Sequence, residues 1–311
     1  MNFFAKIWFY LKYVWGFLTF PCFARKMRKL KKDDETLICL FPHLGDIVYG
    51  LSYAKQYKKD TGKKICVYCG NNMEYYVKQY DFIDRIITYD VKSMQTIYVA
   101  IFPFVRYMGK NKANKDGVFA TVPSTLHFKG LTALEVYRDY IYNVSKNNLS
   151  LYPNINTPIT SIKNFENVKD KIVILNPYSF SMKVDKKLFE TIALSLQNLG
   201  FIVYTNCIPK FGQQPIKGTL VFDAKIPETY SVIENIACFI SLRSGICDMA
   251  ASGKGNLFVI YANNIHKREY FSVKELRSTN VCEEFYGGKK DILRIVRSVD
   301  NFIDNVVNKN K

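Results

Sequence analysis

The chain has 311 residues, 44 of them basic and 27 acidic, and its formal net charge is +17. That length exceeds the usual size of one hydrophobic core, so we expect one large domain or two medium ones. The hydrophobic content of 48% excludes a disordered chain and is ample for a buried core. The charge excess predicts an anionic partner nearby, either membrane lipid, nucleic acid or a phosphorylated substrate.

Residues 1–32 contain eight lysines and arginines and no acid. Apolar side chains recur at helical spacing within this stretch: Phe4, Ile7, Trp8, Leu11, Val14, Trp15 and Leu18. The basic cluster follows the apolar part, which argues against a secretion signal. We therefore expect residues 2–22 to form an interfacial helix, with the basic segment against anionic lipid. The protein would then be a peripheral protein on the cytoplasmic face of the membrane. A spanning helix and a helix docked on the protein's own core are the alternatives.

After residue 33 the pattern changes to alternating strands and helices. Strands are expected at 36–42, 63–69 and 83–90, with helices near 46–59 and 73–79. Such alternation predicts a parallel sheet with right-handed crossovers. Residues 94–112 and 131–144 also have helical patterns, the first interrupted by Pro103.

A second series of the same kind begins near residue 171. Strands are expected at 171–177, 201–206, 219–223, 238–242 and 257–261, and helices at 185–199, 227–236, near 245–252 and at 290–308. Gly200 is a natural helix stop, and Pro227 suits a first helical turn. We expect an α/β protein with two Rossmann-like domains facing across a cleft. The expected divisions are a membrane-associating segment at 1–32, a first domain at 33–160 and a second domain at 161–311, with the last helix able to pack on either domain.

Most of the eight cysteines lie inside apolar runs. Buried thiols in a reducing compartment explain them best. Cys66 and Cys69 are three residues apart on an expected strand, so their side chains point to opposite faces and suit neither a metal nor a redox pair.

Four strand-to-helix loops carry polar residues, at 42–46, 176–183, 225–230 and 242–248. Ligands of open α/β sheets bind at the carboxyl ends of the strands. Lys183 and Arg243 offer cations to phosphate, Gly245 allows close backbone approach, and Ser244 can cap a helix. The set suits a nucleotide diphosphate. The alternative to a ligand site is that Ser244 is only a helix cap and Asp248 only a charge in the first helical turn.

These segments resemble the two-domain GT-B glycosyltransferases, and most nearly the lipopolysaccharide heptosyltransferases of glycosyltransferase family nine. The similar stretches run from "LGDIVYGLSYAKQYKK" through "RIITYD", from "VILNPYSFSMK" through "FIVYTN", and over "IENIACFISLRSGICDMAASGKGNLFVIYA". They cover roughly residues 36–90 and 171–262. The family usually has an acid where this chain has Arg243 and a histidine where it has Asp248, so the donor sugar does not follow from the resemblance.

The resemblance implies transfer of a sugar from a nucleotide-diphosphate donor to a hydroxyl of a cell-surface glycan or glycolipid, such as lipopolysaccharide, lipooligosaccharide or capsule. It makes 33–160 the acceptor-side domain and 161–311 the nucleotide-sugar domain. It implies that Asp46 is the base that takes the acceptor proton; a helix cap is the alternative for this residue. The donor site is expected at Lys183, Glu228, Arg243, Ser244, Gly245 and Asp248. His43, Asn176 and His266 are further candidates. The alternative for His43 is a loop histidine bonded to backbone, and the alternative for His266 is a solvated loop residue.

No Asp-x-Asp pair stands at a strand end, so we expect an inverting, metal-independent transfer with no cofactor. A nucleic-acid partner is not expected. The rival hypothesis is a non-enzymatic, membrane-bound module that binds anionic polymer or nucleic acid, which the charge of +17 favours.

Overall fold

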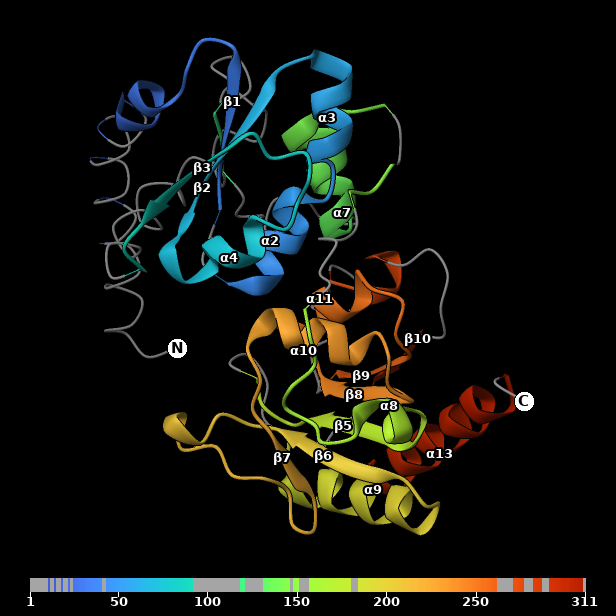
Figure 1. Ribbon diagram of the computed structural model, residues 1–311. Coiled ribbons are helices and arrows are strands. Elements are labelled where there is room, and N and C mark those ends of the chain that lie inside the picture. Colours follow the sequence, from blue (N-terminus) through green and yellow to red (C-terminus); the bar gives the residue numbers. More distant parts are fainter. Residues whose placement is uncertain are drawn as a thin grey trace. The chain divides into compact units, whose positions relative to one another are not determined.

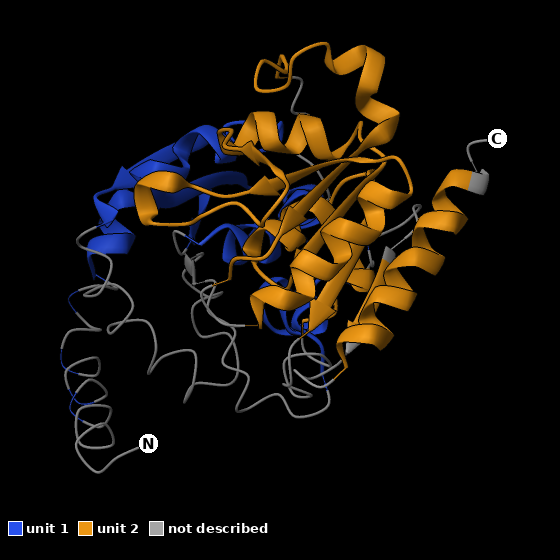
Figure 2. Ribbon diagram, turned by 90° about the horizontal axis from the view of Figure 1, so that it is seen from below, with its two compact units in different colours: residues 1–154 blue, residues 155–311 orange. Residues whose placement is uncertain are grey.

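The computed structural model describes residues 11, 14, 18, 22, 25–40, 43–91, 118–120, 131–145, 148–150, 157–179, 184–261, 271–276, 282–286 and 291–309. The chain divides into two compact units, residues 1–154 and residues 155–311 (Figure 2). Each is described by itself. The expected cleft between two domains stays a prediction.

The first unit contains a parallel sheet with the strand order β3-β2-β1-β4. Its strands are β1 (Glu35–Cys39), β2 (Lys64–Gly70), β3 (Arg85–Tyr89) and β4 (Val118–Ala120). The first three confirm the sequence prediction. The sequence did not reveal β4, since three residues are too few for a periodic pattern. Strand β4 pairs with the edge of β1 opposite β2, so the strand order reverses at β1. The carboxyl end of β1 is therefore the topological switch point of this sheet.

The helix expected near 46–59 is two helices, α2 (Leu44–Leu51) and α3 (Ala54–Thr61). The break coincides with a contact from far along the chain. The Ser150 amide donates to the Ser52 carbonyl, and the Lys55 amide donates to the Ser150 hydroxyl at 2.9 Å. A residue distant in sequence thus satisfies backbone groups at the break, which local patterning cannot anticipate.

Different elements cover the two faces of this sheet. Tyr57 of α3 shares a hydrogen bond with Thr36, whereas Met27 lies 3.6 Å, sulfur to sulfur, from Cys39. Thr36 and Cys39 are three apart on β1 and therefore face opposite sides. The helical residues 25–30 consequently pack on the face opposite α3 (Figure 1). The expected separate segment 1–32 is corrected: its basic end, 25–32, belongs to the first unit.

The remaining described elements of this unit are short. They are η1 (Asn71–Met73), α4 (Glu74–Val77), α7 (Ala133–Val136) and the π-helical turn η3 (Tyr137–Tyr142). Thr132 and Glu135 form a capping box that begins α7, which confirms the helix expected at 131–144. The helix expected at 94–112 lies outside the described residues.

The second unit contains a six-stranded parallel sheet in the order β10-β9-β8-β5-β6-β7. Its strands are β5 (Ile172–Asn176), β6 (Ile202–Asn206), β7 (Leu220–Phe222), β8 (Cys238–Leu242), β9 (Leu257–Tyr261) and β10 (Cys282–Tyr286). If β5 is counted as the first strand of the unit and the sheet is followed from β7 to β10, the strand order is 3-2-1-4-5-6, which is that of a dinucleotide-binding sheet. The topological switch point lies between β5 and β8.

Helices cover both faces of the second sheet (Figure 1). They are α8 (Phe165–Val168), α9 (Lys186–Asn198), α10 (Ile226–Ile233), α11 (Gly245–Ala251) and α13 (Ile292–Lys309), with 3-10 turns η4 (Lys169–Lys171), η5 (Pro209–Phe211) and η6 (Val273–Leu276). Asp185 caps α9 at its start. Gly200, with φ of +87°, follows the end of the helix, which confirms the expected stop. The last helix, α13, packs in this unit: Ser195 of α9 donates to Asp300 at 2.7 Å, and Phe302 meets Phe258 edge to face.

The units divide between Asn154 and Ile155, six residues before the expected boundary. The connecting segment attaches to α10. The Thr157 amide donates to Ser231 at 3.1 Å, and the Thr160 and Ser161 amides donate to Glu228. These bonds place the segment with the second unit rather than the first.

Candidate functional site

The carboxyl ends of β6, β5 and β8 carry side chains that hydrogen-bond to one another. Asn176 ends β5 and is buried. Its amide donates to Ser241 at 2.8 Å and to Ser244 at 3.3 Å, and its oxygen accepts from Asn206 at 2.9 Å. We call Asn176, Asn206, Ser241 and Ser244 the strand-end cluster. It lies at the switch point between β5 and β8, where open α/β sheets bind their ligands.

Ser244 immediately precedes α11, in the N-cap position, yet its side chain makes no capping hydrogen bond. The hydroxyl oxygen instead accepts from Asn176 and lies 3.7 Å from the Cys247 sulfur. The alternative that Ser244 is only a cap is therefore wrong. Sulfur is a weak acceptor, so the hydroxyl proton can be donated to a ligand oxygen.

Arg243 and Asp248 are buried and form an ion pair with each other. Guanidinium nitrogens lie 2.7 and 3.1 Å from the two carboxylate oxygens of Asp248. Arg243 also donates to the carbonyls of Ser244 and Phe271. The two positions at which the chain departs from the family pattern are thus partners in one contact. The expected role of Arg243 as a bidentate phosphate ligand stays a prediction, but in this structure its donors bind groups of the fold.

The ion pair is part of a set of contacts, here called the clamp, that hold residues 271–273. These residues lie ten or more positions after the end of β9. Tyr261 donates to the Phe271 carbonyl at 2.9 Å, and the Ser272 hydroxyl and Val273 amide donate to Glu284 at 2.9 and 2.7 Å. The guanidinium of Arg243 lies 5.7 Å from the Phe271 ring centre. This clamp fixes the segment beside the carboxyl ends of β8 and β9.

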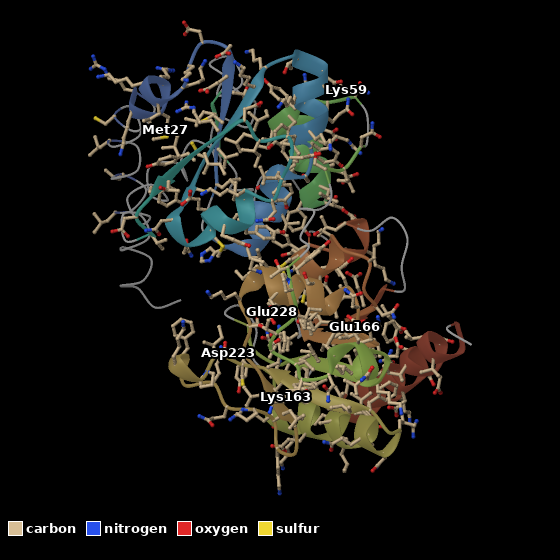
Figure 3. The ribbon with its side chains drawn as sticks, in the orientation of Figure 1. Met27, Lys59, Lys163, Glu166, Asp223 and Glu228 are labelled. Carbon is tan, nitrogen blue, oxygen red and sulfur yellow. The ribbon has the colours of Figure 1, made fainter. Side chains whose placement is uncertain are left out.

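Glu228 is on the first turn of α10, where Figure 3 labels it. One of its oxygens accepts from the Thr160 amide and hydroxyl and from the Ser161 amide at 2.7 Å. Burial opposes ionisation, but these hydrogen bonds outweigh it and lower the pKa of Glu228. The carboxylate therefore holds the connecting segment, which explains it without a donor ligand.

In the first unit, Asp46 lies in the first turn of α2, at the switch point after β1. His43, not Asp46, occupies the N-cap position, and its side chain makes no capping bond. Tyr89 ends β3 and donates to the Leu40 carbonyl at 2.7 Å. Burial, together with nearby groups that include the Asp46 charge, raises the pKa of Tyr89. Asp46 is thus a half-buried acid close to the carboxyl ends of β1 and β3.

Two of the expected site residues, Lys183 and His266, lie outside the described residues. Gly245 is the first residue of α11, next to Ser244 of the strand-end cluster. The structure therefore brings together Asn176, Ser244 and Gly245. It pairs Arg243 with Asp248 and gives Glu228 a structural task.

The buried cysteines and possible metal ligands add no reactive centre to this picture. Burial raises the pKa of Cys66 to about 11 and that of Cys69 to about 12, so both thiols stay protonated at neutral pH. Within the part of the chain that the structure describes, no three His, Cys, Asp or Glu side chains cluster as a metal site would require.

A cavity of about 550 Å³ lies elsewhere in the second unit, lined by residues of 157–167 and by Ser231, Glu234 and Asn235 near the end of α10. These residues precede β5 and β8. The cavity is thus near the amino ends of those strands and not at the carboxyl ends, where the polar cluster lies.

The fold has counterparts among solved structures. A glycosyl transferase of family 9 from Veillonella parvula aligns with a TM-score of 0.57 and 11% identity, over 85% of this chain and 88% of that one. The chain has the fold of these transferases. ADP-heptose lipopolysaccharide heptosyltransferase II of E. coli aligns with a TM-score of 0.58 and 10% identity, over 87% and 99%. No protein-family model and no curated protein sequence matches the chain.

A third structure is the dodecameric, iron-containing heptosyltransferase TibC of enterotoxigenic E. coli in complex with ADP-D-β-D-heptose. It aligns with a TM-score of 0.52 and 16% identity, over 90% of this chain and 76% of that one. These likenesses confirm the expected α/β fold with parallel sheets.

Sequence reasoning missed Asn206 and Ser241 of the strand-end cluster and the clamp residues Phe271 and Glu284. One signal was present: "VILN" and "VYTN" both end a strand with asparagine. The clamp gave no such signal, because Tyr261, Ser272 and Glu284 meet only once β9 and β10 pair.

Proposed function

We propose that the protein is a glycosyltransferase that moves a sugar from a nucleotide-diphosphate donor to a hydroxyl of a cell-surface glycan or glycolipid. The strand-end cluster is the observation that carries the proposal. It presents amide and hydroxyl groups at the switch point of a six-stranded Rossmann-type sheet. Structures of the same fold include heptosyltransferases, one of them with a bound ADP-heptose.

In this proposal the second unit binds the donor. Ser244 donates a hydrogen bond to the diphosphate, and Lys183 neutralises its charge as the leaving group departs. The Arg243–Asp248 pair holds Ser244 and residues 271–273 in place but does not touch phosphate. No metal is assigned to the leaving group, because the sequence has no Asp-x-Asp pair at a strand end.

The first unit supplies the base. The Asp46 carboxylate accepts the proton of the acceptor hydroxyl, the oxygen attacks the anomeric carbon, and the bond from that carbon to the diphosphate oxygen breaks. Attack from the face opposite the leaving group inverts the anomeric centre. His43 is the second candidate for the base.

The first experiment is a thermal-shift series with ADP, UDP, GDP and CDP and the matching monophosphates. A ligand at 100 times its dissociation constant adds about 2.7 kcal/mol to the free energy of unfolding. We expect one diphosphate to raise the melting temperature more than its monophosphate does. The corresponding nucleotide sugars are then assayed for transfer and for donor hydrolysis.

The rival hypothesis predicts a different outcome. A non-enzymatic module for nucleic acid or anionic polymer would show salt-sensitive polymer binding and no response to any diphosphate. That result, together with an absence of donor hydrolysis, would overturn the proposed transferase.

A further inference from the structure

The basic helical segment 25–30 is fixed to the first sheet at two points. Met27 is fully buried, with its sulfur 3.6 Å from the Cys39 sulfur of β1. At the end of the segment Arg85 donates to the Leu30 carbonyl at 2.7 Å and pairs with the buried carboxylate of Glu35. The Lys32 amide donates to the same carboxylate at 2.9 Å. The segment is therefore a rigid part of the first unit.

Burying Met27 determines which side chains face away from the sheet. Arg25, Lys26, Arg28 and Lys29 are all exposed, while Leu30 is half-buried. Successive residues of a helix are turned by about 100°, so the residues next to Met27 lie on the flanks of the helix and those two positions away lie on its far side. Figure 3 labels Met27 in this segment. The result is a cluster of cations whose position on the unit is set by one apolar anchor.

Exposed apolar side chains precede these cations. Leu11, Val14 and Leu18 are helical residues and are 56%, 57% and 68% exposed. Their spacing of three and four residues puts them on one face of a helix. Large apolar side chains exposed in such a row, and followed in the chain by a basic cluster, are typical of a segment that binds a membrane. No helix among the described residues has the length and apolar character to cross a bilayer.

We infer that Leu11, Val14, Leu18 and the cations of segment 25–30 form one surface that binds an anionic lipid bilayer. Charge complementarity selects this partner, since residues 1–32 carry eight basic side chains and no acid. Because Met27 and Arg85 fix the basic segment to the first sheet, the bound protein presents that sheet to the membrane in one orientation. This inference does not depend on the transferase activity.

The test is flotation of the full-length protein with phosphatidylcholine vesicles and with vesicles of mixed phosphatidylcholine and phosphatidylglycerol. The variant Lys26→Gln/Lys29→Gln removes two surface cations, and Lys59→Gln/Lys186→Gln removes two exposed cations elsewhere. We expect the first pair to weaken binding to the anionic vesicles about thirtyfold at low salt. The second pair should retain wild-type binding.

A second matched pair tests the apolar row. Leu11→Ala/Leu18→Ala should weaken binding more than about tenfold and do so at high salt also, because the lost contact is apolar. Leu194→Ala/Leu199→Ala, exposed leucines at the end of α9 and just beyond it, is the control. Melting curves of all four variants establish that each is folded.

Three results would overturn the inference. One is equal loss in a test pair and its control, which would indicate a general charge or hydrophobicity effect. Another is wild-type binding in both test pairs. The third is wild-type protein that binds duplex DNA but no vesicle, which would assign the basic cluster to nucleic acid.

Discussion

The carboxyl edges of the two sheets differ in chemistry. At the second sheet, amides and hydroxyls from β5, β6 and β8 bond to one another through Asn176. At the first sheet, Tyr68 lies two residues before the end of β2 and Tyr89 is the last residue of β3; their ring centres are 4.8 Å apart, and Asp46 lies nearby. The strand order reverses in both sheets, at β1 in the first and at β5 in the second. The two carboxyl edges therefore share a topology but carry different side chains.

The difference matches a division of labour. A network of neutral donors and acceptors holds a polar ligand in a fixed position, since each group is already oriented by its neighbours. A half-buried carboxylate beside aromatic rings is suited to proton transfer. The predictions below test whether the first edge does chemistry while the second edge binds.

The largest expected effect is that of Asp46→Asn. The amide keeps the shape of the side chain but accepts no proton, so sugar transfer should fall about 10²- to 10⁴-fold. Nucleotide diphosphate affinity should stay at the wild-type value, because the proposed donor site is in the other unit. The measurements are a transfer assay and calorimetry with the diphosphate. A fully active variant would end the catalytic role of Asp46, and His43→Gln would be the next variant to make.

Breaking the buried ion pair should cost stability rather than remove a phosphate contact. Arg243→Ala leaves the Asp248 charge buried and unpaired, which typically lowers the free energy of unfolding by about 3–5 kcal/mol. The double variant Arg243→Met/Asp248→Leu replaces both charges with apolar side chains and should recover most of that loss. Denaturant unfolding measures both. Recovered stability with abolished diphosphate binding would mean that Arg243 does contact the donor.

The third variant, Asn176→Ala, tests whether the strand-end cluster binds the donor. Removing the central amide deletes its hydrogen bonds with Ser241, Ser244 and Asn206 and should lower the free energy of unfolding by about 1–3 kcal/mol. Diphosphate binding should weaken in the same variant. Asn198→Ala, an exposed asparagine at the end of α9, is the matched control. Unchanged binding in Asn176→Ala would move the donor site away from the switch point.

The last variant, Lys183→Ala, should have the narrowest effect, because it should change diphosphate affinity alone. Loss of one charged hydrogen bond to phosphate is worth about 1.5–3 kcal/mol, or roughly 10- to 100-fold in affinity. Stability should be unchanged. Lys186→Ala removes an exposed lysine three residues away and should bind the diphosphate normally. If the two variants bind equally well, Lys183 does not contact the donor.

Deleting residues 1–30 would remove part of the first unit, because Met27 is buried there. A boundary after residue 22 keeps the docked segment and is the cleaner truncation.

The sequence by itself determined most of the strands and helices and their order. Continuous apolar runs such as "LICL" and "IVIL" fix buried strands, and Gly200 and Asp185 fix helix ends through local backbone chemistry. Strand-to-helix alternation then implied parallel sheets, whose carboxyl ends gather the loop residues. Asn176, Ser244 and Asp46 could be placed at the carboxyl ends of strands by this reasoning alone.

Tertiary structure decided which side chains bond to which. Sequence patterns report the preference of each segment for a conformation, whereas pairing depends on segments far apart in the chain meeting in space. The partnership of Arg243 with Asp248, the use of Glu228 by Thr160 and Ser161, and the docking of Met27 on β1 all arise in that way. For the same reason β10, with two glutamates in five residues, was not recognised as a strand until it paired with β9.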